Sequence, residues 1–139
     1  MQAIPVVAGI LVRNGQIMIS RRPAGAHMGM KWEFPGGKIE PGETPEQALV
    51  REIREELSAT VEPLRLLHTI EYDYPAFHLS MDCFACVLRG GEPTLREALA
   101  ARWLGEDELE TVDWLPADRV LLPTLRELLA GLRREGFYD

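Results

Sequence analysis

The residues just after position 43 constrain the fold more than any other part of the chain, because they predict where a helix begins. Thr44 is a favourable N-cap, Pro45 suits the first helical position, and Gln47 completes a capping box with Thr44. The helix is expected to end at about position 57 or 58. Its apolar residues recur at intervals of four, at Leu49, Ile53 and Leu57, so this face of the helix is expected to pack against a core.

A neighbouring face of the same helix is acidic. Glu52, Glu55 and Glu56 fall on an arc of about 100° beside the apolar stripe, and like-charged pairs at these spacings destabilise an isolated helix by about 0.2–0.5 kcal/mol each. Arg51 is spaced to pair with Glu55. Such a charge run is usually a solvated face. Because Glu56 borders the apolar stripe and two further acids precede the helix, the cluster also suits a hard cation such as Mg²⁺ or Mn²⁺.

Strands are expected on both sides of this helix. Alternating or continuous apolar residues predict them over Ile4–Val12, Gln16–Arg21, Trp32–Phe34, Leu64–Tyr74, His78–Leu88 and Ala101–Leu104. Asn14-Gly15 predicts a type I′ hairpin between the first two, and Pro35-Gly36-Gly37 predicts a turn.

Two more helical segments are expected toward the end of the chain. One is a short helix over Glu106–Glu110, and the other is an amphipathic helix within Pro116–Arg134 that begins near Leu121 or Pro123. Because strands and helices are interleaved and hairpins also occur, the pattern favours an α/β (α+β) fold. In it, a mixed β-sheet is sandwiched between α-helices.

Composition limits the kinds of protein this chain can be. Its 139 residues are 46% hydrophobic and 27% charged, without a linker or a repeat, so one domain over residues 1–139 is expected. The net charge of −7 argues against binding a nucleic-acid polymer. The apolar run Ile4–Val12 is too short to span a bilayer, so no membrane contact is expected. Two cysteines, Cys83 and Cys86, exclude a disulfide scaffold and fit the reducing cytoplasm as core residues.

The acidic helix and the turn before it carry a longer pattern. Gly37, Glu43, Arg51-Glu52-Ile53 and Glu55-Glu56 resemble the Nudix box in residue type and spacing. The sequence departs from that motif at Ser58, where the family has a glycine that suits a helix C-cap. The resemblance extends to Arg21-Arg22, His27-Met28 and the run from Trp32 to Ala48. There the chain looks like the MutT-like nucleoside triphosphate pyrophosphohydrolases of the Nudix family, and the resemblance implies the Nudix fold.

The resemblance also implies a divalent metal site and a reaction. Its implied ligands are the Gly36 carbonyl and the carboxylates of Glu52, Glu55 and Glu56, and Glu97 falls where related proteins have a further ligand or base. In this family water attacks the β-phosphorus of a nucleoside triphosphate and releases a monophosphate and pyrophosphate. A carboxylate takes the proton of that water, with Glu52 as the first candidate base and Glu97 as the second.

Other residues are expected to surround that site. Gly37, Glu43 and Arg51 are expected to support the ligands, with Glu43 beside Arg51 or beside a ligand. Arg22 is the implied phosphate contact. Lys38 is a second candidate, or a solvated lysine of the loop. Phe34 and Phe77 are candidates for stacking on a base, or are core residues.

Asp118 lies where related proteins have an asparagine that reads oxidised guanine. A carboxylate accepts hydrogen bonds from guanine N1–H and N2–H₂, whereas cytosine presents one donor and one acceptor and better suits a protonated acid. Protonation requires a pKa raised by an apolar pocket. The alternative interpretation is that Asp118 is the N-cap of the final helix.

The sequence therefore predicts a Mg²⁺-dependent pyrophosphohydrolase that removes 8-oxo-dGTP or other modified nucleotides, as a monomer or homodimer. One alternative within this class is hydrolysis of CTP or 5-methyl-dCTP. An alternative of another class is a regulatory Nudix module that binds a nucleotide without hydrolysing it, and retention of Glu52, Glu55 and Glu56 disfavours it.

Overall fold

The computed structural model describes residues 2–94 and 100–136. The strands within them are β1 (Gln2–Arg13), β2 (Gln16–Arg21), β3 (Trp32–Glu33), β4 (Gly36–Lys38), β5 (Thr60–Tyr74), β6 (Phe77–Gly90) and β7 (Ala100–Gly105). The helices are α1 (Pro45–Leu57), the 3-10 helix η1 (Glu106–Glu108), α2 (Pro116–Arg119) and α3 (Leu122–Arg134).

Strand β1 is the centre of a mixed sheet with the order β3-β2-β1-β6-β5. It runs parallel to β6, from Gln2 opposite Phe77 to Leu11 opposite Cys86, and antiparallel to β2. Strand β4 also pairs with β1, and β7 pairs with β2. Because β1 touches β2, β4 and β6, residues from distant parts of the sequence meet around it.

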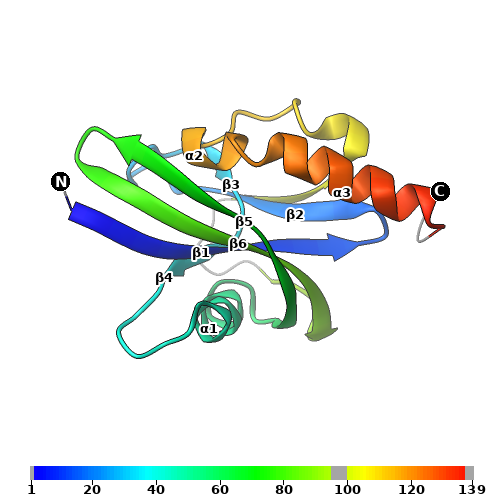
Figure 1. The fold of residues 1–139 in the computed structure, drawn as a ribbon, viewed down its shortest axis with the longest axis horizontal. Helices are drawn as coiled ribbons and strands as arrows, with labels where there is room; N and C mark the ends of the chain where they lie inside the picture. The colour runs from blue at the N-terminus through cyan, green and yellow to red at the C-terminus, as the bar shows by residue number, and fades with distance from the viewer. Residues whose placement is uncertain (1, 95–99, 137–139) are drawn as a thin grey trace.

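Helices cover both faces of this sheet, as Figure 1 shows with α1 below it and α2 and α3 above it. The core under α1 combines its apolar face with strand residues, among them Ala48, Leu49, Ile53, Leu57, Val7, Leu11 and Cys86. The core under α2 and α3 includes Ala117, Leu121, Leu125, Leu129, Ile10, Ile19 and Cys83. The predicted sandwich is confirmed, and the two cysteines are buried on opposite faces.

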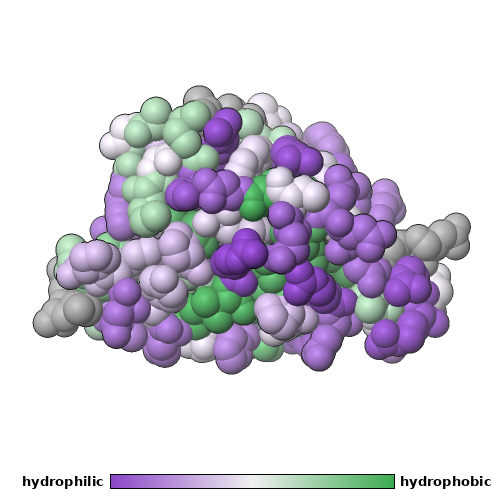
Figure 2. All heavy atoms as spheres, turned by 90° about the horizontal axis from the view of Figure 1, so that it is seen from above, coloured by the Kyte–Doolittle hydropathy of each residue, from purple (hydrophilic) through white to green (hydrophobic). Residues whose placement is uncertain are grey.

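The outer face above the sheet is mostly hydrophilic. Figure 2 shows this face with hydrophilic side chains over much of it, an apolar area near its centre and a weakly apolar area toward its upper left. Within the described residues, no helix combines the length and the hydropathy needed to cross a bilayer.

Local signals in the sequence predicted several elements closely. Thr44 caps α1, its side chain accepts a hydrogen bond from the Gln47 amide, and the reciprocal half of the capping box is also formed. Asn14 and Gly15 both have positive φ, as a type I′ hairpin requires, and they join β1 to β2. At the other end of α1, Ser58 adopts a left-handed conformation, with φ 53° and ψ 33°, in the place of the glycine expected there.

Three expectations need correction. The glycines of Pro35-Gly36-Gly37 form strand β4 instead of a turn, because they pair with Val7 and Ala8 of β1. The prediction that the final helix begins near Leu121 or Pro123 is confirmed by α3, and the short helix α2 precedes it. The short helix near Glu106 is a single 3-10 turn, and β5 begins at Thr60 rather than Leu64 because β6 continues opposite it.

Candidate active site

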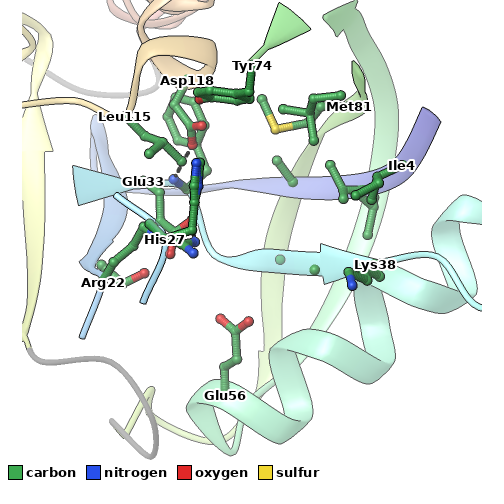
Figure 3. Close-up of a pocket in the computed structure, with 18 of the residues that line it drawn as sticks. Ile4, Arg22, His27, Glu33, Lys38, Glu56, Tyr74, Met81, Leu115 and Asp118 are labelled. Carbon is green, nitrogen blue, oxygen red and sulfur yellow. Dashed lines mark hydrogen bonds and ion pairs between the residues drawn. The ribbon is translucent and has the colours of Figure 1, made fainter. Parts of the chain in front are cut away.

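A cavity of about 530 Å³ lies at one end of the sheet. Its walls come from β1, from the β2–β3 connection, from β4, from the end of α1, from the β5–β6 hairpin and from α2. Figure 3 shows Glu56 rising from α1 at one end of this pocket, with Asp118 and Tyr74 at the opposite end. Arg22, His27 and Glu33 line one side between those ends, and Lys38 and Ile4 line the other.

Arg51 organises the acidic face of α1. Its guanidinium donates to Glu43 at 2.7 and 2.9 Å, to Glu52 at 2.9 Å, to Glu55 at 3.4 Å and to the Lys38 carbonyl at 3.0 Å. The hydrogen bonds from Arg51 and from the Glu40 amide lower the pKa of Glu43 to about 2. The pairing also raises the pKa of Arg51, chiefly through Glu43. The predicted pairing of Glu43 with Arg51 is confirmed.

The two glycines of β4 leave room where side chains would otherwise lie. A Cβ built on Gly37 would be 2.4 Å from Cδ of Glu52, so the Glu52 carboxylate occupies the space that any larger residue would fill. A Cβ built on Gly36 would be 2.0 Å from the carbonyl oxygen of Val7 in β1. Gly36 therefore keeps β4 close to the sheet, and Gly37 lets the Glu52 carboxylate lie against β4.

The donor set at this end of the pocket suits a hard divalent cation. Glu52 and Glu56 supply carboxylate oxygens near β4, beside the backbone of Gly36, and such cations prefer oxygen ligands. Glu55 is more exposed and bonds to Arg51. Within residues 2–94 and 100–136, no three His, Cys, Asp or Glu side chains converge into a complete metal site. The carboxylates of Glu52 and Glu55 are bonded to Arg51. Glu97 lies outside the described residues.

The predicted phosphate contacts have different surroundings. Arg22 donates from Nε to the His27 carbonyl at 2.8 Å and from Nη1 to Glu33 at 2.9 Å, so its guanidinium is fixed on the pocket wall. Lys38 is exposed on β4 and also lines the pocket. Both basic groups therefore reach the cavity from opposite sides (Figure 3).

Asp118 is buried at the far end of the pocket, with 3% of its surface exposed. One of its carboxyl oxygens accepts a hydrogen bond from the Phe34 amide at 2.9 Å. Burial, aided by the negative charge of Glu33, raises the pKa of Asp118 to about 8. The N-cap interpretation is wrong, because α2 is capped by Leu115 and α3 by Leu121, and Asp118 lies inside α2.

The two predicted stacking residues differ. Phe34 is 3% exposed and packs 5.0 Å from the Trp114 ring, so it is a core residue whose edge reaches the cavity. Phe77 is partly exposed and belongs to an aromatic wall, with ring centroids 5.3 Å from Tyr74 and 5.6 Å from His27. The structure thus brings Phe77 to the pocket surface and leaves Phe34 mostly beneath it.

Two further pocket residues were not among the predicted contacts. Glu33 bonds to Arg22, and its burial raises its pKa even though Arg22 opposes the shift. Tyr74 closes β5 and accepts a hydrogen bond from the Ala117 amide at 3.0 Å. In the sequence, Glu33 stands between two aromatic residues, Trp32 and Phe34, and this position indicated that its carboxyl group is buried. No local pattern pointed to Tyr74.

Comparison with known proteins agrees with this geometry. The NUDIX domain model matches residues 6–124. The chain is 39% identical over 129 residues to an 8-oxo-dGTP diphosphatase of Escherichia coli K12, which covers 92% of this chain and all of that protein. It is 36% identical over 143 aligned positions to a CTP pyrophosphohydrolase of the same strain, with 94% and 97% covered. The solution structure of the E. coli ORF135 protein superposes with a TM-score of 0.77 at 32% identity, over 100% of this chain and 96% of that one. A capped acidic helix against a double-glycine strand, in a chain that the family model matches over most of its length, makes this protein a member of the Nudix family.

Proposed function

We propose that this protein hydrolyses nucleoside triphosphates to monophosphates and pyrophosphate, and that 8-oxo-dGTP is its preferred substrate. The observation that carries the proposal is that the two ends of one pocket carry different chemical groups. Glu56 of α1 stands at one end, with Glu52 against the neighbouring Gly37, and a buried Asp118 of raised pKa stands at the other. A nucleotide fits this arrangement with its phosphates toward Glu56 and its base toward Asp118.

The phosphate end is suited to a strongly negative substrate only with a cation. Nudix hydrolases depend on divalent metal ions, and we propose Mg²⁺ here, held by Glu52, Glu56, Glu55 and the Gly36 carbonyl. Such an ion neutralises phosphate charge and lowers the pKa of bound water. Arg22 and Lys38 add positive charge from the two walls. Glu52 is the proposed general base, and Glu97 is the second candidate.

The base end distinguishes nucleotides by hydrogen bonding. With a pKa of about 8, Asp118 is largely a neutral acid near pH 7, so its carboxyl group has one donor and retains acceptor capacity. In 8-oxoguanine, N7 carries a hydrogen beside the O6 acceptor, whereas guanine presents two acceptors there. A neutral Asp118 therefore complements the oxidised base better than guanine.

The experiment that tests this proposal measures kcat/KM with Mg²⁺ for 8-oxo-dGTP, dGTP, dCTP, 5-methyl-dCTP and ADP-ribose, with identification of the products. We expect 8-oxo-dGTP to be preferred and pyrophosphate to be released. Glu52→Gln should lower kcat about 10²- to 10⁴-fold, since it removes a carboxylate that serves the reacting water. Glu127→Gln, an exposed acid on α3, is the matched control and should leave kcat unchanged. Undiminished turnover by Glu52→Gln would remove Glu52 from the mechanism.

Preference for cytosine nucleotides is the second candidate. A neutral Asp118 also complements cytosine, donating to N3 and accepting from the N4 amino group, and the chain's similarity to a CTP pyrophosphohydrolase supports this alternative. A larger kcat/KM for dCTP or 5-methyl-dCTP than for 8-oxo-dGTP would select it. Nucleotide binding without turnover of any substrate would instead favour the regulatory module. A monomer or homodimer in the cytoplasm remains the expected state.

A further inference from the structure

We propose that the Tyr74 hydroxyl is a positioning group that sets the base preference of the pocket by fixing the helix turn that carries Asp118. The inference rests on the proposed function, because it assigns Tyr74 a part in reading the base. Tyr74 lies at the end of β5, distant in sequence from α2, yet Figure 3 shows its side chain beside Asp118 at the same end of the pocket.

The start of α2 explains why this hydroxyl matters. The first amides of any helix lack acceptors within the helix and need partners from outside it. Leu115, at the N-cap, provides no side-chain acceptor, and Pro116 has no amide hydrogen to satisfy. Ala117 is therefore the first residue of α2 whose amide requires an acceptor, and Tyr74 Oη accepts from it at 3.0 Å.

The next residue of α2 is held from a different direction. Asp118 accepts from the Phe34 amide, which lies between β3 and β4, at 2.9 Å. Two consecutive residues of a helix of only four residues are thus held by two other parts of the chain. The Phe34 amide holds the carboxyl group itself, whereas Tyr74 holds the backbone from which that carboxyl group projects.

Tyr74 is itself immobilised, which a positioning group requires. Its side chain is 5% exposed, and its ring lies 4.8 Å from Tyr72, 5.3 Å from Phe77 and 5.4 Å from His27. Burial raises the pKa of Tyr74 to about 12, so the hydroxyl stays neutral throughout the physiological range. The ring fixes the hydroxyl, the hydroxyl fixes the Ala117 amide, and α2 then presents Asp118 to the base.

The test is a double-mutant cycle of Tyr74→Phe and Asp118→Ala, with Tyr72→Phe as the control that removes a neighbouring hydroxyl and keeps its ring. One hydrogen bond of this kind corresponds to about a three- to tenfold effect. We expect Tyr74→Phe to reduce the ratio of kcat/KM between the preferred base and the next by that factor, through KM, with kcat within about twofold of the parent. In the Asp118→Ala background, Tyr74→Phe should change the ratio less than about twofold, because its effect passes through Asp118.

Several outcomes overturn the proposal. The proposal is wrong if Tyr74→Phe lowers kcat/KM equally for all bases, lowers kcat without changing KM, or has no effect. It is also wrong if Tyr74→Phe changes the ratio by the same factor in the Asp118→Ala background, or if Tyr72→Phe has an equal effect. If the parent hydrolyses none of the substrates, the proposed function fails, and the same cycle is then measured as binding of 8-oxo-dGMP and dCMP without metal. If Tyr74→Phe and Asp118→Ala show no coupling in that binding measurement, or if the parent protein binds neither 8-oxo-dGMP nor dCMP, the Tyr74 proposal fails independently of the proposed function.

A measurement on the unmodified protein covers the case in which Tyr74→Phe does not fold. Amide hydrogen exchange followed by NMR should show the Ala117 amide protected against exchange, and faster exchange of this amide in a folded Tyr74→Phe variant. An Ala117 amide that exchanges at the rate of an exposed loop in the parent protein contradicts the proposal without any variant.

Discussion

The protonation of Asp118 is decided by its burial. Removal from water disfavours the carboxylate, and the negative charge of Glu33 adds to that effect, while the Phe34 amide and Arg22 oppose it. The pKa is therefore higher in the folded protein, at about 8, than in the unfolded chain. Between about pH 4 and pH 8 the unfolded chain releases this proton and the folded protein retains it, so the free energy of unfolding contributed by this group falls as pH rises.

Asp118→Asn should abolish this fall in the free energy of unfolding with rising pH, while keeping a side chain of similar size. The free energy of unfolding of the variant, relative to the parent, is expected to rise with pH by up to about 1.4 kcal/mol per pH unit between about pH 4 and pH 8. Above pH 8 the difference should be constant. Urea unfolding of both proteins from pH 5 to pH 9 measures it, and parallel stability curves would show that the acid is ionised in the folded protein.

The adjacent glycines of β4 should respond differently to the same substitution. Gly37→Ala places a methyl group against the end of a side chain, Glu52, whereas Gly36→Ala places it against the backbone of Val7. We expect Gly37→Ala to lower kcat at least about tenfold with a change in unfolding free energy below about 1 kcal/mol. Gly36→Ala should destabilise the fold by about 2 kcal/mol or more. Steady-state kinetics and thermal unfolding of the pair test this, and equal stability losses would contradict it.

At the scale of elements, the residue that ends α1 has a strained backbone conformation because it is not a glycine. Ser58 holds a left-handed conformation that a residue with a Cβ adopts at a cost of about 1 kcal/mol or more, while glycine adopts it readily. Ser58→Gly is therefore expected to raise the free energy of unfolding by about 0.5–1 kcal/mol. Ser58→Ala keeps the Cβ and is the control, which should give no gain. Chemical denaturation measures both, and stabilisation by alanine as well would assign the effect to the hydroxyl instead.

Elements specified by neighbouring residues were predictable, and those specified by distant partners were not. The start of α1 follows from Thr44 and Gln47 alone, and the predicted helix matches the observed one. The glycines of β4 look like a turn until β1 is placed beside them. The position of Asp118 depends on distant partners, because its carboxyl group accepts from the Phe34 amide and the neighbouring Ala117 amide donates to Tyr74. The spacing of the acidic residues on α1 was therefore readable from the sequence, whereas the contacts that bury Asp118 were not.

At the scale of the whole molecule, the proposed cation site predicts that divalent cations stabilise the fold. Mg²⁺ should raise the melting temperature of the parent protein by about 3–6 °C at ten times its dissociation constant, because binding favours the folded state and relieves repulsion on α1. Glu52→Gln and Glu56→Gln should each reduce that shift. Differential scanning fluorimetry with MgCl₂ against NaCl of equal ionic strength measures it. An unchanged shift in both variants would place the cation elsewhere.

The parallel pairing of β1 with β6 has a consequence for how the chain is made. Gln2 meets Phe77, and Leu11 meets Cys86, so each residue of β1 in this pairing is synthesised 75 positions before its partner in β6. Contacts between such distant segments slow folding, since a long loop must close before they form. Before β6 is made, the segments that can cover the apolar strand β1 include β2, β4 and α1. Co-translational folding is thus expected to be completed late, with α1 formed well before the pocket that it lines.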